Sequence, residues 1–526
     1  MMNLLMMFAA LFCISLAESC EKERKLPEKP QVEWTRYQTD LVVRSSELKR
    51  NILYSVYLPA DYETATDKRY DVVYLLHGLG DDHGSWNGRY MHIATLLQSL
   101  ENRGIIAPKI YVMPQGFNSY YVNAYDGSFD YMDFFVEEFI PFIDSNYRTR
   151  PERGHRAIAG YSMGGFGAMV MAAKNPDLFL ATIPLSMSLC QYERYTTEAS
   201  NSDGWDKQWG WIFGGVGLKG DARITDYYKE HCPYYYFTEA SAPSFAGMHW
   251  WLDCGDDEQQ LLIANDRVHR QMRDLGIKHE FRVRNGAHTT DYWRSAMESA
   301  LPWLETLLNG GQYPDAETPN ADTGSFEGRT EELTVGGCTV KVYLSQKFDP
   351  EAERENTLLL AGHDGYTDKE LNGIANALTL ATYSRPCVLA CLDTSSEDAD
   401  LDAVMAALAE KYRIGDSAYR IGLGFGEGAD RLWRYSASGE AGVLGSLFLI
   451  DGNADASACS PDSKTYYYIA TTDEGTHYRS AGEMYELCKK KGATYEYRVR
   501  NGASGYDAVL ACFEATVSDI KAKIKN

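Results

Sequence analysis

The segment HRAIAGYSMGG, residues 155–165, decides the fold of this chain. Its apolar residues before Gly160 predict a short buried strand, and the glycines that follow predict a tight turn into a helix. Gly160, Ser162 and Gly164 form the pattern G-x-S-x-G, which places the serine hydroxyl at the carboxyl edge of a sheet and at a helix N-terminus. We therefore interpret Ser162 as a nucleophile. The alternative is a glycine-rich packing turn that carries a surface serine.

Strand and helix patterns alternate on both sides of this segment. Residues 52–59 alternate apolar and polar side chains, residues 71–78 form a short apolar run that ends at a glycine, and residues 132–147 have helical spacing. Such alternation predicts an α/β fold with a mostly parallel sheet that helices cover on both faces. We expect this domain to span residues 33–308.

A linker and a repeat divide the rest of the chain. Residues 309–327 are rich in Gly, Pro, Asn, Asp and Thr and have no apolar period, which predicts a linker. Beyond it, EFRVRNGAH at 280–288 returns as EYRVRNGAS at 496–504, and two further blocks recur in the same order. We therefore predict an internal duplication, with a second and smaller α/β domain of the same fold over residues 328–526.

Composition excludes several classes of protein. The chain has 526 residues, of which 44% are hydrophobic and 24% charged, as in ordinary globular domains. Its formal net charge of −23 argues against nucleic acid or an anionic membrane face as a partner. The cysteines are scattered without a CxxC pair, so we expect no metal site.

The N-terminus has the pattern of an export signal. An apolar stretch from Leu4 to Ala17 is followed by small residues, which predicts a signal peptide over residues 1–19. Cys20 follows in a context similar to a bacterial lipobox and is a candidate for a lipid anchor. We expect an exported protein that is periplasmic, secreted or held at the cell surface as a lipoprotein.

A serine nucleophile needs a base and an acid. In α/β-hydrolase order the base comes last, and His288 ends a predicted strand near the end of this domain. A solvated loop histidine is the alternative. The acid is expected after the preceding strand, where HWWLDCGDDE supplies Asp256, Asp257 and Glu258, and residue pattern alone does not choose among them.

The oxyanion of an acyl-transfer reaction needs two preorganised N–H donors. One is expected from the backbone of Met163, directly after Ser162. The other is expected from the loop HGLG after an earlier strand, where the Leu79 amide is the best candidate and His77 is a structural residue.

Aromatic residues concentrate in one stretch. Residues 186–251 carry 15 aromatic side chains, including five of the ten Trp of the chain. This insertion could line a cleft for a sugar or a phenolic ester, or form a small core of its own, and the pattern favours neither. The candidate substrate-binding residues are Trp86, Trp205, Trp209 and Trp211.

Five blocks, among them YLLHGLGDDHGSW, RAIAGYSMGGFGAM and HEFRVRNGAHTTDYW, resemble the putative esterase family of α/β hydrolases. Feruloyl esterases, acetyl xylan esterases, S-formylglutathione hydrolases and mycolyltransferases belong to that family. The resemblance covers about 33–308 and implies a Ser-His-acid triad with Ser162 and His288. It also implies oxyanion donors at Leu79 and Met163.

The acid departs from the family pattern. The family usually has Asp three residues after a glycine, and here that position is Glu258, preceded by Asp257. Register favours Glu258, whereas residue type slightly favours Asp257.

The second copy lacks the expected catalytic residues. The aligned pairs are Ser162 with Gly426, His288 with Ser504, Asp257 with Asp473 and Glu258 with Glu474. The interval from nucleophile to base is also shorter in the second copy, where it runs from 426 to 504 rather than from 162 to 288. We predict an inactive pseudo-esterase domain with a structural, carbohydrate-binding or partner-binding role.

These patterns together predict an exported serine carboxylesterase. By resemblance, its substrate is an acylated oligosaccharide or polysaccharide such as feruloylated or acetylated xylan. A thioesterase or acyltransferase of the same family is the alternative. The chemistry requires no cofactor.

Overall fold

The computed structural model describes residues 36–525 except 89–90, 190, 198–205, 259, 315–325, 381–384, 395–399, 439–442, 459 and 503–504. The predicted signal peptide 1–19, Cys20 and most of the predicted linker therefore lie outside the described residues. Within the described part, no helix is both long enough and apolar enough to cross a membrane. Below, the first half means residues 36–308 and the second half residues 326–525.

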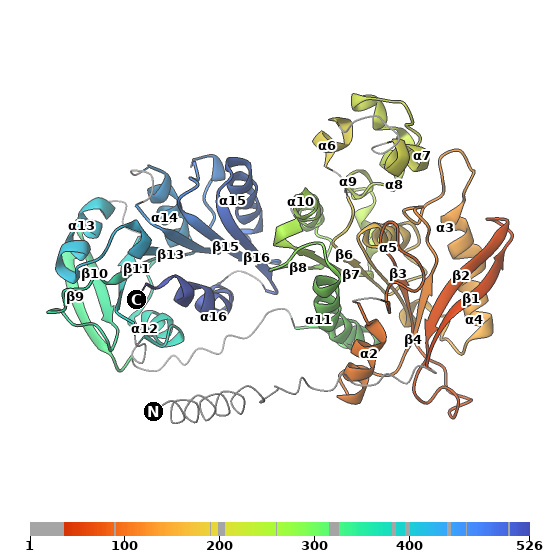
Figure 1. Ribbon diagram of the computed structural model, residues 1–526, viewed down its shortest axis with the longest axis horizontal. Helices are drawn as coiled ribbons and strands as arrows, with labels where there is room; N and C mark the ends of the chain where they lie inside the picture. Colours follow the sequence, from red (N-terminus) through yellow and green to blue (C-terminus); the bar gives the residue numbers. More distant parts are fainter. Residues whose placement is uncertain are drawn as a thin grey trace, which may run out of the picture.

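The described residues form one continuous sheet of 16 strands (Figure 1). The first half contributes β1 (Tyr37–Ser45), β2 (Arg50–Tyr57), β3 (Val72–Leu76), β4 (Ile110–Pro114), β5 (Arg156–Tyr161), β6 (Ala181–Leu185), β7 (His249–Gly255) and β8 (Glu280–Arg284). The second half contributes β9 (Arg329–Val335), β10 (Cys338–Leu344), β11 (Thr357–His363), β12 (Cys387–Asp393), β13 (Arg420–Phe425), β14 (Ser446–Ile450), β15 (Tyr466–Thr472) and β16 (Thr494–Arg500).

Strand order is the same in the two halves. The first half reads β1-β2-β4-β3-β5-β6-β7-β8, and the second reads β9-β10-β12-β11-β13-β14-β15-β16. In each half the two strands nearest the outer edge pair antiparallel and the others pair parallel. The structure thus has the predicted mostly parallel α/β fold. The duplication itself stays a prediction, which this repeated order supports.

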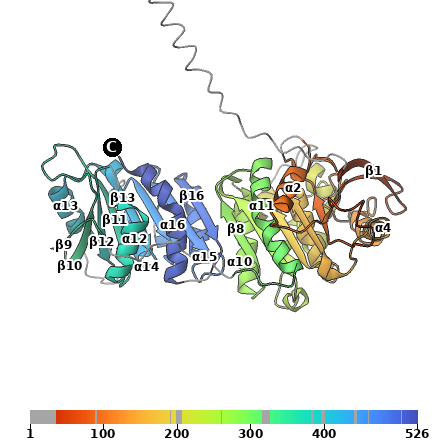
Figure 2. The same ribbon diagram turned by 90° about the horizontal axis from the view of Figure 1, so that it is seen from below.

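Helices cover both faces of the sheet (Figures 1 and 2). One face of the first half carries α3 (Tyr131–Asp133), α4 (Ile140–Asn146), α5 (Met163–Lys174) and α10 (Gln260–Asp274), and the other carries α2 (Ile93–Asn102) and α11 (Thr290–Leu308). In the second half, α13 (Leu401–Tyr412), α14 (Glu427–Ser438) and α15 (Tyr478–Lys491) lie on the first of these faces, and α12 (Asp368–Ala377) and α16 (Tyr506–Lys523) on the other.

Each central strand is buried on both sides, which explains its unbroken apolar sequence. In β3, Val72 and Tyr74 join the core beneath α5, whereas Val73 and Leu75 join the core beneath α2 and α11. This alternation is the two-residue period of a strand.

The halves differ in the connection between their sixth and seventh strands. In the first half, residues 186–248 connect β6 to β7, and they contain α6 (Tyr192–Thr197), α7 (Trp211–Phe213), α8 (Asp226–His231) and α9 (Pro233–Tyr236). These helices stand above the first half in Figure 1 and are called the cap below. In the second half, the much shorter segment 451–465 connects β14 to β15. Within the described residues, the cap is therefore a feature of the first half alone.

Candidate active site

Ser162 lies on a strained turn between β5 and α5. Its backbone has φ 56° and ψ −118°, a region that non-glycine residues rarely adopt. The neighbouring glycines permit this turn, because a Cβ at Gly160 would lie 2.1 Å from Gly164 O, and a Cβ at Gly164 would lie 2.1 Å from Leu76 O. The turn therefore presents the Ser162 hydroxyl at the carboxyl edge of the sheet.

Ser162, His288 and Glu258 form a chain of hydrogen bonds. The Ser162 hydroxyl donates to His288 Nε2 at 2.9 Å, and His288 Nδ1–H donates to Glu258 Oε2 at 2.7 Å. His288 lies on the loop between β8 and α11, and Glu258 ends the single helical turn Asp256–Glu258 after β7. Three different strand ends thus bring these side chains together.

The carboxylate that contacts His288 belongs to Glu258 and not to Asp257. Partial burial, followed by the neighbouring Asp256, raises the pKa of Asp257, whose backbone N–H donates to Gly286 O at 2.9 Å. The preference for Asp257 by residue type is therefore not matched by the geometry. The register argument, which counts three residues from Gly255, selects the residue that the structure places beside the imidazole.

Glu258 has two further partners that fix its orientation. Its Oε1 accepts hydrogen bonds from Gly255 N at 3.0 Å and from the Ser186 hydroxyl. Ser186 in turn accepts from Trp293 Nε1 at 2.8 Å, and the Trp293 ring lies edge-on to His288 with 4.8 Å between centroids. The Trp293 indole thus contacts the His288 imidazole and also donates to Ser186, which holds the Glu258 carboxylate.

Ser186 and Trp293 were missed in the sequence analysis. Trp293 follows His288 by five residues in NGAHTTDYW, and its place on the first turns of α11 was a usable signal. Ser186 directly follows β6 with φ 45°, and nothing in its local sequence distinguishes it.

The loop after β3 lies against the start of α5, as the predicted oxyanion donors require. A Cβ at Gly164 would lie 2.7 Å from His77 O, so the two segments touch. Met163 is the first residue of α5, and the N–H groups of a first helical turn have no partner within the helix. Gly80 N–H donates to Asn118 Oδ1 at 2.9 Å, which fixes the loop around Leu79.

His77 is a structural residue of this loop. Its Nδ1–H donates to Gly78 O at 2.8 Å, and its Nε2 accepts from Gly116 N at 2.8 Å. Burial lowers the pKa of His77, and its ring links the loop after β3 to the loop after β4.

The structure contradicts the prediction that Trp86 and Trp209 bind substrate. Trp86 is 0% exposed and packs edge-on against Tyr161. Trp209 is 5% exposed and packs against Tyr120, with 4.6 Å between the ring centroids. Large rings bury readily in cores, and aromatic clustering in a sequence does not reveal which rings remain open. Trp211 is half-buried beside the same core, and Trp205 lies outside the described residues.

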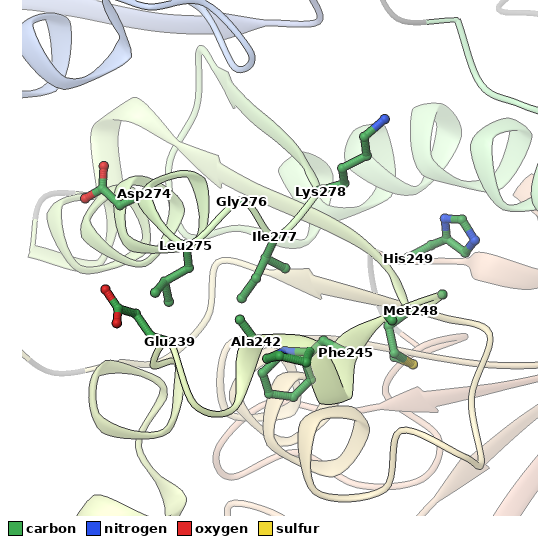
Figure 3. Close-up of a pocket in the computed structure, with 13 residues that line it drawn as sticks. Glu239, Ala242, Phe245, Met248, His249, Asp274, Leu275, Gly276, Ile277 and Lys278 are labelled. Atoms are coloured by element: carbon green, nitrogen blue, oxygen red, sulfur yellow. The ribbon is translucent and has the colours of Figure 1, made fainter.

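A cavity of about 640 Å³ lies at the amino ends of β7 and β8 (Figure 3). Its lining includes Phe245, His249, Leu275, Ile277 and Lys278, which lie at or before the amino ends of β7 and β8. The catalytic candidates follow the carboxyl ends of the strands. This cavity therefore does not belong to the site of Ser162.

Comparison with known proteins decides the family. Residues 45–304 match the profile of the family described as Putative esterase. This part of the chain belongs to the putative esterase family. The match confirms the family that the sequence resemblance predicted.

Several esterases are similar to this chain over part of its length. An esterase of Mycobacterium tuberculosis is 34% identical over 149 residues, which are 28% of this chain and 30% of the relative. An endo-1,4-beta-xylanase/feruloyl esterase of Xylanibacter ruminicola is 33% identical over 133 residues, 24% of this chain and 18% of the relative. The chain therefore spans less than a third of the length of these relatives.

Two matches cover nearly the whole of the similar protein. An acetyl esterase of Caldicellulosiruptor saccharolyticus is 24% identical over 280 residues, which are 50% of this chain and 96% of the relative. Among solved structures, a ferulic acid esterase is 30% identical, with 52% of this chain and 98% of that chain covered and a TM-score of 0.44.

The candidate active site has no counterpart among the described residues of the second half. Gly426, which the sequence repeat aligns with Ser162, has the same backbone conformation in φ, at 55°. Asp256 Oδ1 accepts from Gly286 N at 3.1 Å, and Asp473 Oδ1 accepts from the equivalent Gly502 N at 3.1 Å. Asp473 is thus the equivalent of Asp256, and the alignment of Asp473 with Asp257 was one residue out of register.

The corrected register removes the acid as well. Gly475 is the equivalent of Glu258 in the first half, and Glu474 is the equivalent of Asp257. Ser504, the predicted counterpart of His288, lies outside the described residues. At the two positions that the structure does describe, glycines therefore replace the nucleophile and the acid.

Proposed function

We propose that the first half is a serine carboxylesterase that hydrolyses feruloyl or acetyl esters on plant polysaccharide such as xylan. The observation that carries this proposal is the hydrogen-bonded chain from Ser162 through His288 to Glu258. Relatives named feruloyl esterase and acetyl esterase support the substrate class. Family membership of residues 45–304 supports the reaction type.

The geometry accounts for acylation. Ser162 Oγ attacks the ester carbonyl carbon while His288 Nε2 takes the hydroxyl proton, and the Glu258 carboxylate stabilises the imidazolium. The backbone N–H groups of Met163 and Leu79 stabilise the negative charge on the carbonyl oxygen. The imidazolium then gives its proton to the alcohol oxygen of the sugar, which leaves, and the acyl group stays on Ser162.

Deacylation repeats these steps with water. His288 takes a proton from water as the oxygen attacks the acyl carbon, and returns it to Ser162 Oγ as the carboxylic acid departs. Atoms and charges balance without a metal or an organic cofactor.

The substrate contacts require a new assignment, because Trp86 and Trp209 are buried. Tyr125 and Tyr192 are 58% and 44% exposed, and Gly214 of the cap packs against the Tyr125 ring. Tyr192 lies on α6 of the cap and Tyr125 lies on the segment between β4 and α3 that packs against it, and exposed rings suit stacking on a sugar or a feruloyl ring. We assign Tyr125 and Tyr192 as candidate contacts with the polysaccharide.

We also propose that the protein is exported, with a lipid anchor at Cys20. The apolar N-terminal stretch supports this proposal. Fractionation of cells that express the full chain, with Cys20→Ala as the matched variant, tests both parts. Release of the variant from the membrane fraction is the expected result, and recovery of the unprocessed chain in the cytoplasm would overturn the proposal.

A substrate panel tests the catalytic proposal. Purified protein is assayed on methyl ferulate, acetylated xylan, p-nitrophenyl acetate and an acyl thioester, with Ser162→Ala as control. We expect release of ferulate or acetate from the oxygen esters and none by the variant. A dominant thioester activity, or transfer of the acyl group to added sugar acceptors, would favour the alternative reactions. Equal turnover by the variant would remove the proposal.

A further inference from the structure

The two halves meet about a local two-fold axis. β8 and β16 pair antiparallel, with Val283 directly opposite Val499. These valines occupy the same place in the segment RVRNGA, which occurs once in each half. Antiparallel pairing of equivalent residues relates two strands by a two-fold rotation. The second half therefore lies beside the strand that leads to His288.

Equivalent arginines cross this axis in both directions. Arg498 of the second half pairs with Asp256 of the first, and Arg282 of the first half pairs with Asp473 of the second at 2.6 Å. The backbone N–H before each arginine donates to the same carboxylate, at 3.2 Å and 2.9 Å respectively. Each half thus holds the turn that follows the other half's seventh strand.

In the first half, that turn carries the triad acid. Asp256 precedes Glu258 by two residues, and its Oδ1 accepts from Gly286 N at 3.1 Å. A second bond, from Asp257 N to Gly286 O at 2.9 Å, joins the same two segments. Gly286 precedes His288 by two residues. Asp256 is therefore bonded on one side to the second half and on the other side to the histidine loop.

The ion pair of Arg498 and Asp256 is buried, so water does not readily take the place of either partner. Asp256 is 2% exposed and the Arg498 side chain is 9% exposed. A buried carboxylate that loses its cation is strongly destabilised and moves or takes up a proton. Either response would disturb the turn that carries Glu258.

Charge on the neighbouring helices makes this contact specific to the two halves. Arg270 of α10 pairs with Glu486 of α15, and Arg267 reaches the same carboxylate at 3.0 Å. Arg270 and Glu486 are equivalent residues, because the same interval separates them as separates the two RVRNGA segments. Two copies of the first half would place arginine against arginine here, so the complementary partner is the second half of the same chain.

We propose that Arg498 is a positioning residue for the triad, which acts through Asp256 to hold the Glu258 turn and the His288 loop together. The second half, which has Gly426 in place of the nucleophile, thus completes the esterase site. The catalytic consequence rests on the proposed function, whereas the effect on the hydrogen bond between His288 and Glu258 can be measured without any substrate.

Matched variants in the full chain test this role. Arg498→Met removes the contact with the acid turn, and Arg282→Met removes the equivalent contact with the turn that has no acid. Arg498→Lys restores a cation but not the planar fork that reaches both Asp256 and Glu496. Activity is measured well below the melting temperature of each variant, with active sites counted by a fluorophosphonate.

We expect Arg498→Met to lower kcat about tenfold with KM within about twofold, because displaced catalytic groups slow the chemical step without removing a substrate contact. Arg498→Lys should recover most of this loss, and Arg282→Met should keep kcat within about twofold. Equal kcat losses in the two methionine variants, or none in Arg498→Met, would overturn the proposal.

A proton resonance separates this inference from the proposed function. The Nδ1 proton of His288, bonded to a carboxylate, gives a downfield signal that His288→Gln lacks. We expect the signal to persist in Arg282→Met and to shift or broaden in Arg498→Met. If the wild type hydrolyses no ester while this pattern holds, the proposed function fails and the positioning role stands. An unchanged signal in Arg498→Met would contradict the positioning role.

Discussion

The two halves share a strand order but differ at every position where the first half has a catalytic candidate and the structure describes its counterpart. Gly426 replaces Ser162 and Gly475 replaces Glu258, whereas Asp256 and Asp473 retain the same bonds to the glycine of the next loop. The groups that hold the backbone are thus present in both halves, and the groups proposed to react are present in one. Framework and chemistry are separable in this fold.

The largest difference between the halves is expected at the nucleophile. Ser162→Ala should lower kcat by about 10⁵-fold or more, because the hydroxyl forms the covalent intermediate. Gly426→Ala in the second half should leave kcat within about twofold. Both are measured with p-nitrophenyl acetate, and circular dichroism checks the fold. Loss of activity from Gly426→Ala in a folded protein would show that the second half contributes to the chemistry.

The acid gives the next largest effect. Glu258→Gln should lower kcat by about 10³- to 10⁴-fold, since the amide cannot stabilise the imidazolium. Asp257→Asn, one residue earlier, should change kcat by less than about threefold, because Asp257 does not contact His288. The reverse order of effects in kcat/KM would make Asp257 the acid and contradict the observed register.

A buried histidine pair should make the first half less stable in acid than the second half. His269 Nδ1–H donates to His279 Nε2 at 2.7 Å in the first half, where the second half has Tyr485 and Tyr495. Burial, and for His269 next the other histidine, lowers both pKa values well below the usual value. The unfolded chain takes up protons near pH 6.5 and the folded chain does not, so stability falls as the pH drops below that value.

Between pH 6.5 and 5, each histidine should lower the free energy of unfolding, because only the unfolded chain gains the proton. The double variant His269→Tyr with His279→Tyr, which has the residues of the second half, should lose that part of the pH dependence. Urea unfolding at pH 7.5 and pH 5 measures the difference. Equal acid sensitivity of the variant and the wild type would show that other groups control it.

The smallest expected difference is backbone strain at the two turns. Ser162 and Gly426 have φ 56° and 55°, and only glycine adopts this region without cost. Ser162→Gly should therefore raise the unfolding free energy by about 1 kcal/mol, and Gly426→Ala should lower it by about 1–2 kcal/mol. Thermal unfolding measures both changes, and the same sign for the two variants would exclude strain as their cause.

The sequence predicted those features that local pattern encodes. Buried parallel strands have unbroken apolar runs, so the segment 71–78 located β3. Chain order and strand ends located Ser162 and His288, which the structure brings within one hydrogen bond of each other.

Features that depend on distant packing were not predictable in the same way. The choice between Asp257 and Glu258 depends on a single residue of register, and residue type favoured the side chain that does not contact His288. Trp86 is buried by Tyr161, which comes much later in the chain. Arg498 reaches Asp256 from the other half of the chain, and no local pattern records that contact.

The continuous sheet also affects how the chain avoids aggregation. β8 and β16 are end strands of their halves, and an end strand offers unpaired N–H and C=O groups to any other strand. Their pairing leaves β1 and β9 as the outer edges of the described sheet. Cutting the chain within 309–327 and removing one half would expose a strand that is now covered. Such a fragment would offer this edge to strands of other proteins, because like charges at Arg270 or Glu486 disfavour symmetric pairing with its own copy.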